Sequence, residues 1–144
     1  MKLELNIDEK VKETLVVVSA NKIDKEVQNL INYIEYSSEY LIGIVEDKAS
    51  IIDIDEIIRV YIEDRKTFVV TLKDTYVVKK KLYEVESMVT RNFIKISQSE
   101  IANIKFIKNL DFSNTGTIVI KYKNSDISYV SRRMIKEFKL KLGI

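Results

Sequence analysis

The stretch "RNFIKISQSEIANIKFI", residues 91–107, says more about this protein than any other part of its sequence. Two apolar runs flank a polar break at Gln98 and Ser99, and basic side chains stand among eight apolar positions. Gln98 and Lys95 would be held rigidly at the surface, because a side chain on a supported element is better positioned than one on a free loop. The positions that we expect to fix the segment to a core are Phe93, Ile94 or Ile96, Ile101 and Ile104.

The residues on both sides of this stretch predict a mainly β protein. Alternation of apolar and polar residues indicates strands at Leu41–Val45, at Ile51–Ile54 and at residues 60–62. A helix fits "KLYEVESMV" (81–89) better, because its apolar residues recur at helical spacing. The other predicted strands are "TFVVTLK" (67–73) and "YVVKK" (76–80), which form a hairpin around "KDT", then "KFIKNLDF" (105–112), "TIVIKY" (117–122) and "ISYVS" (127–131).

The first 39 residues predict a small α+β extension. Residues 2–8 alternate and indicate a strand, and residues 14–20 indicate a second, more buried strand. A helix follows from 24 to about 35, with Asp24 as its N-cap. The helical pattern then breaks at "EYSSEY", so we place a mainly β domain over residues 40–144.

The composition excludes most enzyme classes. The chain has 144 residues with no His and no Cys, which removes the usual general base, Ser-His triads and thiolate chemistry. Its three glycines are too scattered for a phosphate-binding loop. Asp53 and Asp55 would share one face of a strand, where an exposed acidic edge is a better interpretation than a metal site. No apolar run has the ~18 residues of a membrane span, and we expect a cytoplasmic protein without a cofactor.

Charge is divided unevenly along the chain. Residues 1–64 hold 7 Lys/Arg and 15 Asp/Glu, whereas residues 65–144 hold 17 Lys/Arg and 7 Asp/Glu. A basic half of this kind is typical of a protein that binds a polyanion. A Lys-rich solvated surface would give the same composition, so both interpretations stay open at this point.

The last segment, "SRRMIKEFKLKLG" (131–143), predicts a helix that Ser131 caps and that ends at Gly143. Arg132 and Arg133 would lie in its first turn, where the helix dipole disfavours cations. A bound phosphate or a guanine would turn this arrangement into a site. The alternative is that both side chains point into solvent at a cost of a few tenths of a kcal/mol.

Three consecutive lysines follow another predicted strand. If Lys79, Lys80 and Lys81 close that strand, Lys79 and Lys81 share a face at about the ~7 Å spacing of phosphates on one DNA strand. Contacts of this type set affinity and register but not sequence choice. A solubilising edge strand is the alternative interpretation.

Taken in order, these pieces resemble a LytTR-type DNA-binding domain. The resemblance rests on "YIEDRKTFVV" (61–70), "NFIKISQSEIANI" (92–104), the Asn-containing hairpin turn and "VSRRMIKEF" (130–138), and it runs from about residue 42 to the C-terminus. It implies a multi-stranded β fold with short helices that reads DNA without a helix-turn-helix. The chain is most similar to stand-alone members, which lack a receiver domain.

The resemblance also implies which residues contact DNA. Side chains on loops and strand ends would enter two successive major grooves of imperfect direct repeats, with two copies bound. The loop after the first family strand departs from members that carry a His there. Base contacts are expected from Lys66, Gln98 and Arg133, base or phosphate contacts from Arg65, Lys95 and Arg132, and phosphate contacts from Lys79, Lys81, Arg91 and Lys136.

The leading hypothesis is therefore a sequence-specific transcriptional regulator of double-stranded DNA. The resemblance further implies a homodimer or tandem binding, no small-molecule substrate, and a membrane-bound regulatory protein as a partner. The alternative is a protein–protein adaptor, in which the acidic half binds one partner and the basic half binds RNA or an acidic protein. An enzyme ranks third, because His, Cys and a glycine-rich loop are missing.

Overall fold

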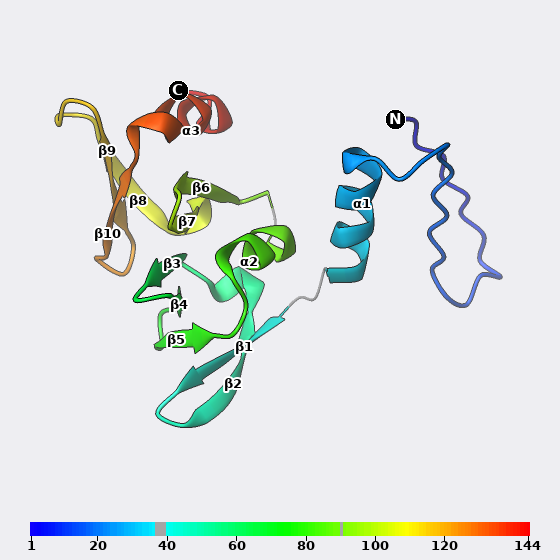
Figure 1. The fold of residues 1–144 in the computed structure, drawn as a ribbon, viewed down its shortest axis with the longest axis horizontal. Helices are drawn as coiled ribbons and strands as arrows, with labels where there is room; N and C mark the ends of the chain where they lie inside the picture. The colour runs from blue at the N-terminus through cyan, green and yellow to red at the C-terminus, as the bar shows by residue number, and fades with distance from the viewer. Residues whose placement is uncertain (37–39, 90) are drawn as a thin grey trace.

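Two antiparallel sheets make up most of the protein. The computed structural model describes residues 1–36, 40–89 and 91–144, and their strands form a seven-stranded sheet and a three-stranded sheet (Figure 1). The seven-stranded sheet has the order β2-β1-β5-β4-β3-β7-β6, and the three-stranded sheet has the order β10-β9-β8. The predicted mainly β fold is confirmed. The strands are β1 (Tyr40–Val45), β2 (Lys48–Asp53), β3 (Arg59–Glu63), β4 (Lys66–Val70), β5 (Thr75–Val78), β6 (Phe93–Ser97), β7 (Glu100–Asn103), β8 (Ile107–Asp111), β9 (Ile118–Tyr122) and β10 (Ile127–Val130).

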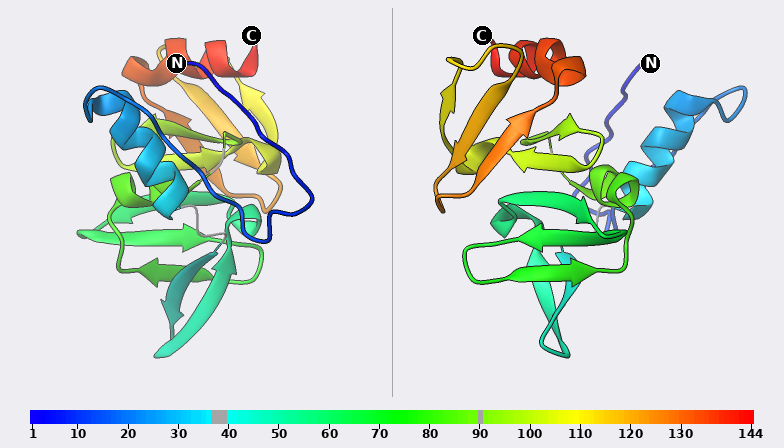
Figure 2. Two further views of the ribbon diagram at one scale, coloured as in Figure 1. Left: turned by 90° about the vertical axis from the view of Figure 1, so that its right-hand side faces the viewer. Right: turned by 60° about the vertical axis from the view of Figure 1, so that its left-hand side comes forward.

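Short helices connect and cover these sheets. They are α1 (Lys25–Tyr36), α2 (Leu82–Met88) and α3 (Ile135–Leu142), with three 3-10 turns at η1 (Ile54–Glu56), η2 (Ile104–Phe106) and η3 (Arg132–Met134). Helix α1 packs against α2, and α3 lies across one end of the three-stranded sheet (Figure 2). Among the described residues, no helix is both long and apolar enough to cross a membrane.

The stretch that opened the sequence analysis forms the β6–β7 hairpin. Its register pairs Phe93 with Asn103 and Ile94 with Ala102. Side chains alternate between the faces of a strand, so Phe93 joins one hydrophobic cluster while Ile94 and Ile96 join another. Of the residues expected in the core, Phe93, Ile94, Ile96 and Ile101 are buried, and Ile104 is half-buried.

The two clusters lie on opposite faces of the seven-stranded sheet. The first fills the space between this sheet and α2 and includes Val60, Val69 and Val85. The second joins the other face to the three-stranded sheet and α3, with Ile96, Tyr122 and Phe138 fully buried. Burial of such side chains contributes about 1.5–3 kcal/mol each, so the clusters fix the relative position of the sheets.

The predicted N-terminal strands are not formed. Residues 1–23 contain turns but neither helix nor strand, and Leu5 and Val17 are 76% and 74% exposed. The prediction was wrong because alternation makes a strand only where a partner strand completes the hydrogen-bond ladder. The predicted helix is confirmed as α1, and Asp24 caps it by accepting a 2.9 Å hydrogen bond from the Val27 N–H.

Two further local predictions fail. Strand β5 ends at Val78, so Lys79–Lys81 form a bend before α2 rather than the end of a strand. Asp53 ends β2 while Asp55 lies in η1, so these carboxylates do not share a strand face. In both places a new element begins where the sequence pattern continued, which local periodicity does not reveal.

Candidate nucleic-acid interface

Four polar segments from distant parts of the chain meet at one end of the domain. Strand β3 pairs with β7 so that Tyr61 faces Glu100, and the Ile62 N–H donates to the Ser99 carbonyl at 2.9 Å. The β3–β4 turn and the β6–β7 turn therefore lie side by side. We call this end, together with the β5–α2 bend and η3, the basic end (residues 64–66, 79–81, 98–99 and 131–133).

The β3–β4 turn presents Arg65 and Lys66. Asp64 and Arg65 both have positive φ, at 49° and 63°, and such a turn matches the twist of a tight hairpin. Neither residue is glycine, and a left-handed conformation costs about 1–2 kcal/mol for an ordinary residue. Arg65 and Lys66 are exposed. The hairpin thus holds an exposed cation at its tip at the expense of local strain.

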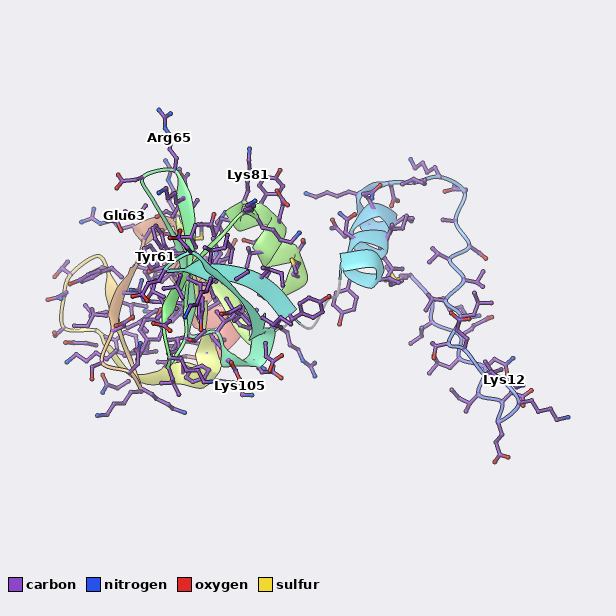
Figure 3. The ribbon with its side chains drawn as sticks, turned by 90° about the horizontal axis from the view of Figure 1, so that it is seen from below. Lys12, Tyr61, Glu63, Arg65, Lys81 and Lys105 are labelled. Atoms are coloured by element: carbon purple, nitrogen blue, oxygen red, sulfur yellow. The ribbon has the colours of Figure 1, made fainter. Side chains whose placement is uncertain are left out.

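The lysine bend lies next to that turn. Val78 pairs with Thr67, so Lys79 follows directly beside Lys66 in the neighbouring strand. Lys79, Lys80 and Lys81 are exposed. Figure 3 shows Arg65 and Lys81 projecting from the same side of the domain, with Lys105 on the opposite side. The structure therefore brings the lysines to the basic end, although not on a strand.

Gln98 occupies the β6–β7 turn. Its side chain is exposed, while the strands on either side of it are anchored in both hydrophobic clusters. The turn is braced by the Ser99 N–H, which donates to the Ser97 hydroxyl at 3.2 Å. The expectation that a buried segment supports an exposed amide agrees with this geometry.

The arginine pair arrives from the other sheet. The Ser131 N–H donates to the Ile96 carbonyl at 2.8 Å, which fixes η3 beside the end of β6. Arg132 packs against Gly116 in the β8–β9 loop, where a Cβ would lie 2.7 Å from the Arg132 Nε. Arg133 is exposed. One arginine is therefore held by a neighbouring loop and the other is presented to solvent.

The predicted placement of these arginines in the first turn of a helix is wrong. They lie in a 3-10 turn closed by the Met134 N–H on the Ser131 carbonyl at 2.9 Å, and α3 begins only at Ile135. Ser131 makes no side-chain cap. The argument from the helix dipole consequently loses its basis. Gly143 does end α3, in the left-handed conformation with φ of 71°.

Two predicted contact residues lie away from the basic end. Arg91 precedes β6, at the opposite end of that strand from Gln98. With the half-buried Lys95 and with Lys141 it lines a groove of about 370 Å³ that also contains Glu86 and Glu137. Lys136 differs from these two because it lies on α3, exposed and one turn after Arg133.

A polar network that the sequence analysis did not predict ties the two sheets together. Arg59 donates through Nε to Asp126 Oδ2 at 2.9 Å and through Nη1 to Glu100 Oε1 at 2.8 Å. Ser128 donates to the same Glu100 oxygen at 3.0 Å, and the Arg59 guanidinium lies over the Tyr61 ring at 4.6 Å from its centroid. The two ion pairs span 41 and 67 positions of sequence, so no local pattern could indicate them.

The network sits in a dry environment. The Arg59 and Glu100 side chains are only 18% and 15% exposed. Burial alone would lower the pKa of Arg59, but hydrogen bonds and opposite charges from Asp126 and Glu100 outweigh it and raise that pKa. Burial also raises the pKa of the neighbouring Tyr122, whose hydroxyl makes no hydrogen bond within the described residues. The network positions Glu100, the residue that follows the β6–β7 turn, against the three-stranded sheet.

A further polar loop borders the basic end. The β8–β9 loop carries the exposed Asn114 and Thr115 beside Gly116, against which Arg132 packs. From the sequence alone, this segment is predicted only as a turn between two strands. The sequence shows that its side chains are polar, but not that they lie close to η3. That closeness depends on the pairing of Val130 with Ile118, which brings the start of β9 beside the end of β10.

Comparison with known proteins shows the family of this chain. The family model of the LytTr DNA-binding domain matches residues 47–143. An "Uncharacterized HTH-type transcriptional regulator" of Staphylococcus aureus (strain MSSA476) is 32% identical over 146 residues, covering 100% of this chain and 99% of that protein. A relative with the same description from strain MRSA252 is 31% identical with the same coverage.

The fold comparison points the same way. The LytTr DNA-binding domain of a Bacillus cereus protein superposes with a TM-score of 0.72 at 22% identity, covering 74% of this chain and 99% of that domain. The described helices of the present chain are separated by strands, so none of them forms a helix-turn-helix pair. The prediction of a regulator rather than an enzyme is confirmed: the chain belongs to the LytTR family of DNA-binding transcriptional regulators.

Proposed function

We propose that the basic end recognises specific sequences in double-stranded DNA. The observation that carries this proposal is the pairing of β3 with β7, together with the Ser131–Ile96 hydrogen bond, because these contacts collect three separate turns on one side. Lys66, Gln98 and Arg133 would contact bases, and Arg65 and Arg132 would contact bases or phosphates. Arg and Lys suit the guanine edge and Gln suits the adenine edge in a major groove.

Charge at this end supports the proposal. Exposed Lys and Arg side chains from three segments outnumber the two acidic residues nearby, Glu63 and Asp64. Lys79, Lys81, Arg132 and Lys136 would neutralise phosphates and fix the register of the domain on the duplex. Arg91 precedes β6 and Lys95 is half-buried in the middle of that strand, and we assign neither a base contact. The exposed cations of the basic end are Arg65, Lys66, Lys79, Lys80, Lys81, Arg132 and Arg133.

The same surface suggests how the whole protein would bind DNA. Turns from both sheets reach outward together, so one domain would contact successive major grooves, and two copies would occupy two half-sites arranged as a direct repeat. Residues 40–144 would form the DNA-binding unit and residues 1–39 a separate element for assembly or regulation. The protein would act in the cytoplasm, with a membrane-bound protein as a candidate regulator of the extension.

The test is binding to duplexes taken from upstream of the gene's own operon, measured at several salt concentrations. Four phosphate contacts predict that log K falls against log salt with a slope of about −3.6. A preference for one fragment over a scrambled duplex supports sequence-specific recognition. A flat salt response would contradict the proposed surface and favour the adaptor function, in which the basic half binds a protein.

A further inference from the structure

The N-terminal segment exposes an apolar face that no part of the described chain covers. Leu3, Leu5 and Ile7 are 80%, 76% and 89% exposed, and they alternate with Lys2, Glu4, Asn6 and Asp8. Residues 1–23 extend beyond α1, away from the sheets, with Lys12 near the far end of the molecule (Figures 1 and 3). Alternation of this kind is typical of a strand with one buried face. Within the described chain, however, this segment has no partner strand.

A turn marks where this segment stops. The Val11 N–H donates to the Asp8 carbonyl at 3.1 Å, and the Lys10 N–H donates to Asp8 Oδ1 at 2.9 Å. The chain reverses here, so residues 2–8 precede the turn as one segment that contains neither helix nor turn. The side-chain oxygen used in this turn leaves the second carboxylate oxygen of Asp8 free to face another chain.

We propose that residues 2–8 pair antiparallel with the same residues of a second copy, about a two-fold axis at Leu5. In this register Leu5 faces Leu5, Leu3 faces Ile7, and Glu4 faces Asn6. Lys2 faces Asp8 twice, once on each side of the axis. All apolar side chains then lie on one face of the new sheet, and both charged pairs are of opposite sign.

Charge excludes the neighbouring registers. A slip that keeps the apolar faces together must move the axis by one residue. Moving it to Glu4 sets two Glu4 carboxylates opposite each other. Moving it to Asn6 sets Lys2 opposite Lys10 and Glu4 opposite Asp8. Like charges directly opposite each other destabilise a pair of strands, so the sequence of residues 2–10 favours a single register.

The rest of the molecule is compatible with this pairing. The paired segment lies beyond α1, away from the sheets (Figure 1), so we expect the pairing to leave the basic end of each copy accessible. The helix that follows also exposes apolar surface, since Tyr33 of α1 is 63% exposed. The Staphylococcus aureus relatives match the chain over its whole length, including the residues that precede the family domain.

The β1–β2 hairpin is a second candidate for self-association. Ile42 and Ile51 face each other across the β1–β2 hairpin and are 49% and 70% exposed, and β2 is an edge strand. Its residues offer no comparable selection of register by charge. Ile51→Lys is therefore the matched control for Leu5→Lys, because each places a charge on an exposed apolar strand.

Disulfide trapping tests the register directly in the full chain, which has no native cysteine. Directly opposed residues in antiparallel strands have Cα atoms about 4.5–5.5 Å apart, which a disulfide can bridge. Leu5→Cys should cross-link with itself under mild oxidation. Leu3→Cys should not cross-link with itself but should cross-link with Ile7→Cys when the two variants are mixed. Equal self-linking at positions 3, 5 and 7 would overturn the proposed register.

Sedimentation of the unmodified chain and of charge variants completes the test. The wild-type chain and Ile51→Lys should be dimers, whereas Leu5→Lys and Lys2→Glu should be monomers with unchanged near-UV circular dichroism, because residues 2–8 contain no aromatic side chain. Combining Lys2→Glu with Asp8→Lys should restore the dimer, because the opposite charges are exchanged rather than lost. The proposal is overturned by a monomeric wild-type chain, by dissociation in Ile51→Lys but not in Leu5→Lys, or by failure of the double variant to recover.

Discussion

At the scale of single residues, the loss of a base contact and the loss of a phosphate contact should affect DNA affinity in different ways. Gln98→Ala removes an uncharged amide from the β6–β7 turn, so affinity for the operator should fall by ~1–3 kcal/mol while the salt slope stays the same. Lys79→Ala should weaken binding to every duplex and reduce the slope by about one unit. Fluorescence anisotropy with operator and scrambled duplexes measures both effects.

Arg91→Ala is the matched control for Lys79→Ala, because it removes a cation of the same sequence half from outside the basic end. Its salt slope should equal that of the wild-type chain. A slope reduced by about one unit would show that DNA also reaches the groove beside β6. If Gln98→Ala lowers binding to operator and scrambled DNA equally, Gln98 contacts the backbone and not a base.

The strained tip of the β3–β4 turn offers a second prediction. Arg65→Gly relieves a positive φ of 63°, and the gain exceeds the extra entropy of glycine in the unfolded chain by about 0.5–1 kcal/mol. Asp47→Gly relieves an almost identical φ of 62° in the β1–β2 turn. Both variants should be slightly more stable in urea, but only Arg65→Gly should bind DNA less tightly. Equal DNA affinity for the two would remove Arg65 from the proposed surface.

No hydrogen bond of good geometry reaches the buried Tyr122 hydroxyl within the described residues, although the nearby Ser128 opposes the rise that burial causes in its pKa, and we expect this poorly satisfied group to destabilise the fold. A buried polar group without a partner costs about 1–3 kcal/mol. Tyr122→Phe keeps the ring in the second hydrophobic cluster and removes that group, so the free energy of unfolding should rise. Urea denaturation at neutral pH measures the change. A clear loss of stability would mean that the hydroxyl is hydrogen-bonded in solution, for example through water.

At the scale of the elements, the Arg59 network should hold the two sheets in register. Glu100→Gln removes the charge that faces Arg59 and Ser128 in a mostly buried position. Hydrogen bonds to charged groups contribute about 1.5–3 kcal/mol, so unfolding should become easier by that order. Glu56→Gln is the control, because Glu56 is exposed in η1, outside every proposed interface, and forms no ion pair within the described residues, so its charge should add little.

Elements whose apolar pattern is satisfied within the chain were predictable from the sequence. The helices α1 and α2 and the β8–β9 hairpin occur where helical spacing or alternation placed them, whereas residues 93–103 were predicted only as a segment anchored in the core. The failures share a physical cause, which is tertiary contact. The Ser131–Ile96 hydrogen bond fixes η3 before α3 can begin, and residues 2–8 and 14–20 find no partner strand within the described chain. Local patterns carry no information about such partners.

The candidate site was predictable in its residue types more than in its geometry. Exposed Gln98 and the Lys79–Lys81 run were readable as polar breaks and charges. Their closeness, and the distance of Arg91 from them, depend on the order of strands in the seven-stranded sheet. Strand order is a long-range property, because three strands (β4, β5 and β6) and the helix α2 separate β3 from its partner β7 in the sequence.

At the scale of the whole molecule, the division between extension and domain can be tested by truncation. A fragment of residues 40–144 retains both hydrophobic clusters and every segment of the basic end, so it should fold and bind one half-site as tightly as the full chain. It loses the segment proposed to pair two copies, so its affinity for an operator with two half-sites should fall more steeply. Linked domains gain about 10²–10⁴-fold in affinity over separate ones when both can bind together. Titration of one-site and two-site duplexes, with melting curves for both proteins, measures the difference. A folded fragment that no longer binds a single half-site would place residues 1–39 in the DNA contact and contradict the division.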